Sequence, residues 1–265
     1  DVCSSDLKSI RSSAAHRGGD PTETQLEAFL RHLESSLQRR GVAMPYRAFY
    51  FPAHVYGVGP LKVYTTGLAM LVNQQTTNVL KGNSDLPFDI THRGSERLKR
   101  VKQTRIAAHL HLEDTKGRPF HLFNTHLSLP TPWAKEFWSQ KAKMGHGANQ
   151  LTEAKAVAEY AQHVARSEPY LIVGDFNSAP ATPVYQLLTG DAKLRGAQES
   201  LKLIDPSRTN SFSTAGFMKL RMHLDHIFGN KVEFADMEDT RAFGDGTSPF
   251  HGLSDHVPLI TRIGL

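Results

Sequence analysis

The chain has 265 residues, of which 39% are hydrophobic and 22% charged, as in an ordinary soluble globular protein. No run approaches the roughly 20 apolar residues of a membrane-spanning helix, which excludes an integral membrane protein. The net charge of +5 and the pI of about 9.3 favour a polyanionic partner, and a basic surface without a specific partner is the alternative. The single cysteine, Cys3, excludes an intramolecular disulfide and a cysteine-based zinc cluster.

The first seven residues, DVCSSDL, are the peptide encoded by one reading frame of a common sequencing-adapter end. We therefore predict that residues 1–7 are not native and that the open reading frame is cut at its 5′ end. A native N-terminus is the alternative. Under this hypothesis Cys3 is not native and any targeting signal is missing, so the localisation stays open. Residues 8–265 are predicted to form a single domain, truncated at its N-terminus.

The first predicted element is a helix that begins near Asp20. Its apolar residues recur at i, i+3, i+4 and i+7, and they are Leu26, Phe29, Leu30, Leu33 and Leu37. Strands are expected at 46–51 and 67–72, with Gly57, Gly59 and Pro60 in the loop between them. The stretch 73–100 has weak periodicity and is expected to be a loop with at most one strand.

The middle of the chain gives clearer signals. Two strands at 105–112 and 120–127 are joined by a Lys116-Gly117 turn. Helices are expected from Asn149 onward and at 183–188. Further strands are predicted at 170–173, 222–228, 232–237 and 257–263. Because strands outnumber helices and include hairpins, sheets covered by helices are favoured over a purely alternating parallel fold.

Polar residues occupy four positions at or within these strands. NTH (124–126) closes one strand, GDFN (174–177) follows the buried strand, SDH (254–256) precedes the last strand, and LDHIF (224–228) lies inside one. Carboxylates at strand ends can hold Mg²⁺ and orient water, and a His paired with an Asp can transfer protons. Each motif alone arises by chance or as a turn. The four together, in this order, predict phosphoester hydrolysis.

This set of motifs resembles the endonuclease/exonuclease/phosphatase superfamily, from about Gly67 to the C-terminus. GDFN and SDH are the specific motifs, and NTHL and LDHIF support them. The resemblance implies a DNase-I-like, four-layer α/β sandwich of two facing mixed β-sheets flanked by helices. It also implies a hydrolase of phosphoester bonds, either a phosphodiesterase (nuclease) or a phosphatase, with Mg²⁺ or Mn²⁺ as cofactor.

The resemblance further implies a role for each catalytic residue. His126 would contact the scissile phosphate. Asp175 would orient or activate the attacking water, and Asn177 would bind the phosphoryl oxygens. Asp225 would hold His256, which would interact with the reacting phosphate or transfer a proton to it.

Two expected parts of the family's site do not occur in the sequence. Family members carry an Asn after the first strand and a metal-ligating Glu in a "QE" segment after the second, both before the first helix. Only Asp255 is therefore expected near the metal, and the first strands are predicted to be missing. We expect this chain to be poorly stable and nearly inactive. A non-catalytic binding module that kept the fold but lost its metal site is the alternative, and the retained site residues argue against it.

Further substrate contacts are expected from Arg221 and His251, and His146 lies in another loop near the site. Trp133 and Trp138 follow the NTH motif in a basic, aromatic loop that could stack on a base or enter a lipid surface. Simple anchoring of that loop is the alternative. Nucleic acid is slightly favoured over phospholipid or sugar phosphate as the substrate.

Three histidines in the predicted hairpin strands lie away from these motifs. They are His109, His111 and His121, and we interpret them as structural.

Overall fold

The structure is a computed structural model that describes residues 7–8, 24–58, 61–92, 103–130, 144–208, 213–217, 220–240 and 254–265. Side chains are described for these residues except 7–8, 55–65, 217 and 220. The predicted aromatic loop with Trp133 and Trp138 lies outside the described residues, and so does His251. None of the described helices combines the length and the apolar composition that crossing a bilayer requires.

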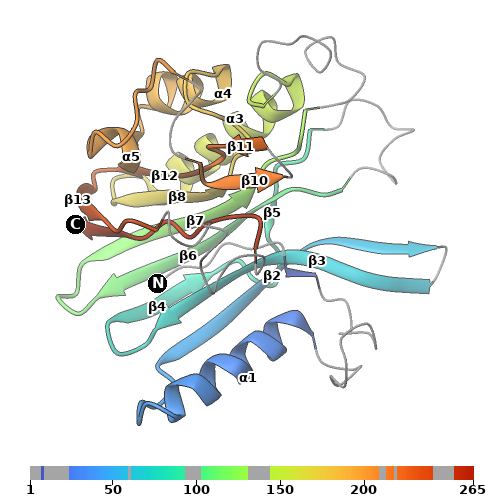
Figure 1. The fold of residues 1–265 in the computed structure, drawn as a ribbon, viewed down its shortest axis with the longest axis vertical. Helices are drawn as coiled ribbons and strands as arrows, with labels where there is room; N and C mark the ends of the chain where they lie inside the picture. The colour runs from blue at the N-terminus through green and yellow to red at the C-terminus, as the bar shows by residue number, and fades with distance from the viewer. Residues whose placement is uncertain are drawn as a thin grey trace.

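The larger sheet has the strand order β4-β6-β7-β8-β12-β9, with β5 paired to β6 (Figure 1). β7 and β8 are parallel and the other pairs are antiparallel, so the sheet is mixed. The stretch after Asn73, expected to be mostly loop, supplies β4 and β5. The bounds are β4 (Thr77–Gly82), β5 (Phe88–Asp89), β6 (Ile106–Asp114), β7 (Pro119–His126), β8 (Tyr170–Asp175), β9 (Arg195–Gly196) and β12 (Asp225–Asn230).

The smaller sheet is built on a long hairpin of β2 (Tyr46–Val58) and β3 (Leu61–Asn73), with β1 (Leu7–Lys8) on the other side of β3. The expected loop at 52–66 is wrong, because the pairing continues from Tyr46 opposite Asn73 to Val58 opposite Leu61. Register shifts after Pro52 and after Tyr56 absorb the proline and the glycine, and the ladder resumes beyond each.

Two short ribbons complete the strands. β10 (Ala215–Phe217) pairs with β11 (Leu220–Met222), and β13 (Glu233–Met237) pairs with β14 (Thr261–Gly264). The last strand begins at Thr261 rather than at Val257 as expected. The residue after Val257 is Pro258, which has no N–H for a ladder, and the N–H of Val257 donates to the Thr214 carbonyl at 2.8 Å.

Each face of the larger sheet has its own apolar core. On one face, Phe51, Leu68 and Met70 from the β2–β3 hairpin pack against Leu110 and Leu122 of β6 and β7. The other face is covered by α3 (Ala148–Ala165), α4 (Pro183–Gln186) and the π-helical turn that follows it (Leu187–Asp191) (Figure 1). The short α5 (Ala197–Ser200) contributes Ala197 to the core on the hairpin side. The structure thus confirms a mixed α/β fold with a central mixed sheet and flanking helices.

The first helix, α1 (Gln25–Gln38), is where the expected helix lies. A capping box begins it: the N–H of Glu27 donates to Thr24 Oγ1 at 3.2 Å, and the N–H of Thr24 donates to Glu27 Oε2 at 2.7 Å. The helix lies on the outer side of the β2–β3 hairpin (Figure 1), but none of its side chains is fully buried, and Phe29 is 45% exposed. The leucines of its apolar stripe are only partly buried among the described residues, so the complete four-layer sandwich stays a prediction.

The expected strand at 222–228 is interrupted. β11 ends at Met222 and β12 begins at Asp225, so Asp225 stands at a strand end and not inside a strand as expected. The interruption accompanies two hydrogen bonds: the N–H groups of Leu224 and Asp225 both donate to Thr214 Oγ1 at 2.9 Å. The Thr214 hydroxyl thus accepts the hydrogen bonds that the backbone of a neighbouring strand would otherwise accept.

Gly174 marks the closest approach of β7 and β8. Its φ is +137°, and a Cβ at this position would lie 1.9 Å from the carbonyl oxygen of Thr125. We predict that Gly174→Ala lowers the free energy of unfolding by about 3 kcal/mol, because both the backbone strain and the overpacking are unfavourable. Urea denaturation measures this change.

Gly190→Ala is the matched control for this substitution. Gly190 has no neighbour within 4 Å of an added Cβ and lies in a helical turn, where alanine is preferred. Its stability should be equal to or slightly above that of the parent. A Gly174→Ala protein as stable as the parent would contradict the close approach of the two strands.

Candidate active site

The ends of β7 and β8 and the start of β12 lie side by side in the larger sheet. His126 at the end of β7 pairs in parallel with Asp175 at the end of β8, and Asp225 at the start of β12 lies opposite Asp175. Since hydrogen-bonded strands lie about 4.8 Å apart, the register alone brings these three side chains to one edge of the sheet. The structure therefore unites residues that are up to 99 positions apart in the sequence.

Asp175 is the centre of this group. Its Oδ2 lies 3.4 Å from His126 Nε2 and 4.0 Å from His256 Nε2, and its Oδ1 accepts a hydrogen bond from the N–H of Asn177 at 2.8 Å. Burial raises the pKa of the Asp175 carboxyl; the nearby His126 opposes this effect and the Asp225 carboxylate adds to it. A raised pKa makes the carboxylate a stronger base.

Asp225 fixes His256. Its Oδ2 lies 2.8 Å from His256 Nδ1, and His256 is also held by a β-bridge to Ala215. This hydrogen bond is the main reason why the pKa of His256 is raised to about 9; burial opposes it, and the charges of Asp225, Asp175 and Asp255 contribute further. At neutral pH His256 is consequently an imidazolium whose Nε2 lies toward Asp175.

Asn177 fastens the loop after β8 to two other elements. Its φ of 47° is a left-handed conformation, which asparagine tolerates better than most residues. Its Nδ2 donates to the carbonyl of Leu127 at 2.8 Å, and its own carbonyl accepts from Gln150 Nε2 of α3 at 2.7 Å. Only 4% of Asn177 is exposed. The hydrogen bond to Leu127 uses one of the two N–H donors of the side-chain amide.

Two buried residues of α3 position the site and were missed by the sequence analysis. Gln150 Oε1 accepts from the N–H groups of Gly145 and Gly147 at 3.0 and 3.2 Å. Glu153 is fully buried and accepts from the N–H and the hydroxyl of Ser128 at 2.7 and 2.8 Å, just after β7. The available signal was that both polar residues lie beside the apolar face of the predicted helix.

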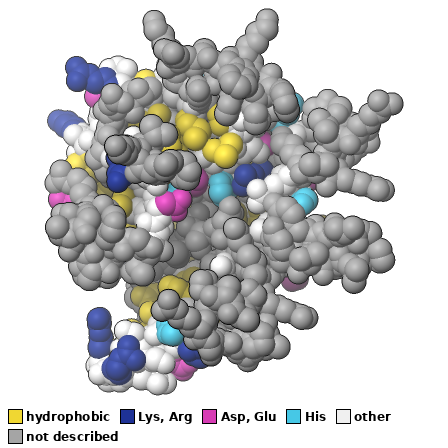
Figure 2. Space-filling view, turned by 45° about the vertical axis from the view of Figure 1, so that its right-hand side comes forward, with side chains coloured by type: hydrophobic (Ala, Val, Ile, Leu, Met, Phe, Trp, Pro, Cys, Tyr) yellow, Lys and Arg dark blue, Asp and Glu magenta, His cyan; other side chains and the backbone are white. Residues whose placement is uncertain are grey.

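The remaining expected residues lie around this group. Asp255 is exposed, and its carbonyl accepts from the N–H of Gly216 at 2.7 Å. Arg221 is also exposed, on β11, and its guanidinium lies over Gly216, next to the Ala215 that bridges to His256. The face in Figure 2 shows histidine, acidic and basic side chains gathered near its centre.

A magnesium ion requires several oxygen ligands, and the described carboxylates of the site do not supply a set for it. Asp175 Oδ1 is engaged by the Asn177 N–H and its Oδ2 faces two imidazoles, while Asp225 Oδ2 is paired with His256. Asp255 is an exposed carboxylate at the edge of the site. Within the described part of the chain these residues do not complete a magnesium site.

A sequence model described as the "Endonuclease/Exonuclease/phosphatase family" matches residues 22–256. The chain belongs to this family, whose members are phosphoester hydrolases and typically depend on a divalent metal. Among curated proteins, no sequence matches the chain.

Solved structures share the fold at low sequence identity. The human Nocturnin catalytic domain with bound sulfate is 20% identical, with a TM-score of 0.60 over 89% of this chain and 77% of that chain. ANGEL2, a 2′,3′-cyclic phosphatase, is 15% identical, with a TM-score of 0.61 over 91% and 79%. A mannosyl-6-phosphatase of Bacteroides thetaiotaomicron is 15% identical, with a TM-score of 0.60 over 89% and 82%.

The Asp225–His256 pair predicts a dependence on pH. The folded pKa of about 9 lies above the ordinary 6.5, so the pair's contribution to stability is complete below pH 6.5 and is lost as the pH rises through 9. In Asp225→Asn we expect the pKa of His256 to fall toward or below 6.5. Titration of the His256 ring signals by NMR measures this pKa.

Asp236→Asn is the control, because Asp236 is half exposed and pairs with Arg262 on the β13–β14 ribbon. It should leave the titration of His256 unchanged. The stability difference between the parent and Asp225→Asn should also become smaller from pH 7 to pH 10. An unaltered His256 titration in Asp225→Asn would contradict the pairing.

Proposed function

We propose that this chain carries the reaction centre of a metal-dependent phosphoester hydrolase, formed by His126, Asp175, Asn177, Asp225 and His256. One observation carries the proposal: a largely buried carboxylate, Asp175, whose side chain is 15% exposed, lies near two imidazoles, and one of these is held by a second carboxylate. An acceptor for a water proton thus lies beside two groups that can meet phosphoryl charge.

In the proposed reaction, a water oxygen bonds to phosphorus while its proton passes to Asp175. The bond between phosphorus and the leaving oxygen breaks on the opposite side, in line with the attack. His126 and the remaining amide hydrogen of Asn177 lie toward the phosphoryl oxygens. The imidazolium of His256 stabilises the developing charge or gives its Nε2 proton to the leaving oxygen. Asp225 keeps this imidazolium charged and oriented.

Mg²⁺ or Mn²⁺ is the proposed cofactor, as is typical of the family, and Asp255 is its proposed neighbour. Such an ion would neutralise phosphoryl charge. Because the described residues do not complete its site, we expect this chain by itself to be nearly inactive. The proton transfers above are assigned to the chain's own residues.

We propose a phosphorylated substrate, with nucleic acid ahead of phospholipid or sugar phosphate. The net charge of +5 supports a polyanion, and the exposed Arg221 on β11, which pairs with the β10 strand whose Ala215 bridges to His256, supports a phosphate contact. Competition among a short oligonucleotide, a sugar phosphate and phospholipid vesicles for the site would rank the three classes. Tighter binding of the sugar phosphate would overturn the preferred order.

The proposal is tested by the hydrolysis of bis(p-nitrophenyl) phosphate and p-nitrophenyl phosphate with Mg²⁺ or Mn²⁺ and with EDTA. We expect turnover far below the roughly 10 s⁻¹ of a typical enzyme, measurable at high protein concentration. Asp175→Asn should reduce this turnover at least about 100-fold, since a general base contributes that much or more. Asp236→Asn should leave it unchanged.

Phosphate binding separates the hydrolase from a binding module. Inorganic phosphate is expected to shift the NMR signals of His126 and His256 in the parent chain. Phosphate binding without any turnover, under every divalent cation, would favour the module that kept the fold but lost catalysis. Turnover that Asp175→Asn leaves intact would show that the reaction centre is wrongly assigned, and rapid turnover by the parent would contradict the expected near-inactivity.

A further inference from the structure

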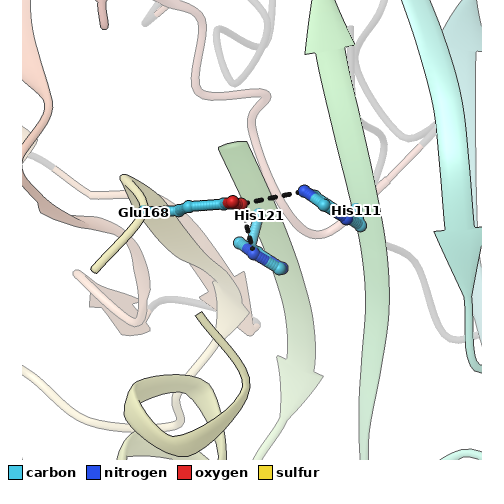
Figure 3. A group of neighbouring side chains, drawn as sticks. All are labelled: His111, His121 and Glu168. Carbon is cyan, nitrogen blue, oxygen red and sulfur yellow. Dashed lines mark hydrogen bonds and ion pairs between the residues drawn. The ribbon is translucent and has the colours of Figure 1, made fainter. Parts of the chain in front are cut away.

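A second polar cluster lies on the α3-covered face of the larger sheet, far from the reaction centre. His121 precedes His126 by five residues on β7, which corresponds to about 17 Å of extended strand. Its neighbours are His111 on β6 and Glu168, which follows α3 (Figure 3). This separation makes the cluster independent of the proposed phosphoester chemistry.

The three side chains converge on one point. Glu168 Oε2 lies 2.9 Å from His121 Nε2 and 2.9 Å from His111 Nε2, and all three ligand atoms lie within 4.8 Å of one another. Figure 3 shows one carboxylate oxygen of Glu168 in contact with both imidazoles. We propose that His111, His121 and Glu168 form a zinc-binding site.

The backbone holds these groups in place. His111 and His121 are directly opposite each other in the β6–β7 ladder, and their rings stack with centroids 4.2 Å apart at 2°. The N–H of Glu168 donates to the carbonyl of Ala165 at 2.9 Å, and the N–H of His121 donates to the carbonyl of Pro169 at 2.9 Å. Ligands on paired strands and an anchored turn are positioned before an ion arrives.

One nitrogen of the cluster lacks a hydrogen-bond partner among the described residues. His111 Nε2 is buried and lies 2.9 Å from Glu168 Oε2, yet the direction of approach does not make a hydrogen bond. The distance marks electrostatic contact, and the orientation leaves the nitrogen unsatisfied. A buried unsatisfied polar atom requires an explanation such as an ion, and a cation between the three groups would satisfy it.

A further histidine supports His121 from behind. His109 Nε2 lies 2.8 Å from His121 Nδ1, and the His109 ring is buried against Phe123 with centroids 4.5 Å apart. A metal-ligating histidine commonly donates its other N–H to an acceptor, which fixes the ring and its tautomer. With His121 Nε2 on a metal, its Nδ1–H would donate to His109 Nε2.

The ligand set selects zinc over the proposed cofactor of the reaction centre. Two imidazoles and one carboxylate suit Zn²⁺, with water as the fourth ligand, whereas Mg²⁺ prefers oxygen ligands throughout. A tetrahedral zinc ion with bonds of about 2.0 Å separates its ligand atoms by about 3.3 Å. The carboxylate would move outward from its 2.9 Å contacts, and the His111 ring, which is stacked on His121, would turn so that its Nε2 lone pair faces the ion. The side chains of His111 and Glu168 are 25% and 36% exposed, so the ion and its water can enter from solvent.

The test is a titration of the full chain with zinc in excess Mg²⁺, followed by calorimetry and metal analysis, after removal of any histidine tag. We expect one tightly bound zinc ion that raises the thermal midpoint. Glu168→Gln and His111→Ala should each weaken zinc binding at least tenfold and abolish the increase in midpoint. Glu168→Gln is nearly isosteric at a partly exposed position, so its fold, checked by circular dichroism, should be retained.

Two controls locate the ion. His163→Ala, on the exposed side of α3, and His126→Ala, in the reaction centre, should both keep the tight zinc ion. Cobalt(II) in place of zinc should give the absorption bands of a tetrahedral site in the parent and not in Glu168→Gln. No tight zinc binding by the parent would overturn the proposal. So would unchanged binding in Glu168→Gln and His111→Ala, or loss of binding in His126→Ala alone.

Discussion

The pairing of β8 with β7 on one side and β12 on the other is the constraint on which the candidate site depends. Parallel pairing places His126 beside Asp175, and antiparallel pairing places Asp225 opposite the same residue. A shift of one residue in either register would turn one of these side chains to the other face of the sheet. Gly174 makes the close approach to β7 possible, because any side chain there would meet the Thr125 carbonyl. The geometry of the candidate site is therefore set by the register of the sheet.

Helix α3 stabilises this arrangement from behind the sheet. Its buried Gln150 and Glu153 satisfy backbone groups in the segments that follow β7 and β8. A buried carboxylate is tolerated only when its oxygens are hydrogen-bonded, and Glu153 accepts from both the N–H and the hydroxyl of Ser128. The cost of burying these polar side chains is offset because they hydrogen-bond backbone groups in two loops. Without them, those buried backbone groups would be unpaired.

Local patterns predicted the elements whose signals are contained in a few neighbouring residues. The hairpin at Gly117, the helix near Asn149 and the buried strand before Gly174 are present, and residues of the polar motifs lie close together. The long β2–β3 hairpin was not predicted, because bulges carry its pairing past a proline and a glycine that normally end strands. The position of Asp225 depends on the distant Thr214 hydroxyl, which no local pattern contains.

The histidine cluster could not be predicted from local sequence patterns either. From the sequence, the three histidines are interpreted as structural residues of a hairpin. In the structure, the register places His111 opposite His121, and a turn brings Glu168 into contact with both. The carboxylate that changes their chemistry is 47 residues away from His121. Alternation along a strand reports only burial, so it cannot distinguish a structural histidine from a ligand.

The dipole of helix α3 also places partial charges of opposite sign near the two proposed sites. The helix begins next to Asn177 in the candidate reaction centre and ends just before the turn that carries Glu168. Its dipole therefore directs partial positive charge toward the proposed phosphate site and partial negative charge toward the histidine cluster. An anion is favoured at the first end and a cation at the second. The same helix that orders the Asp175 loop thus supports phosphate binding at one edge and the proposed zinc site at the other.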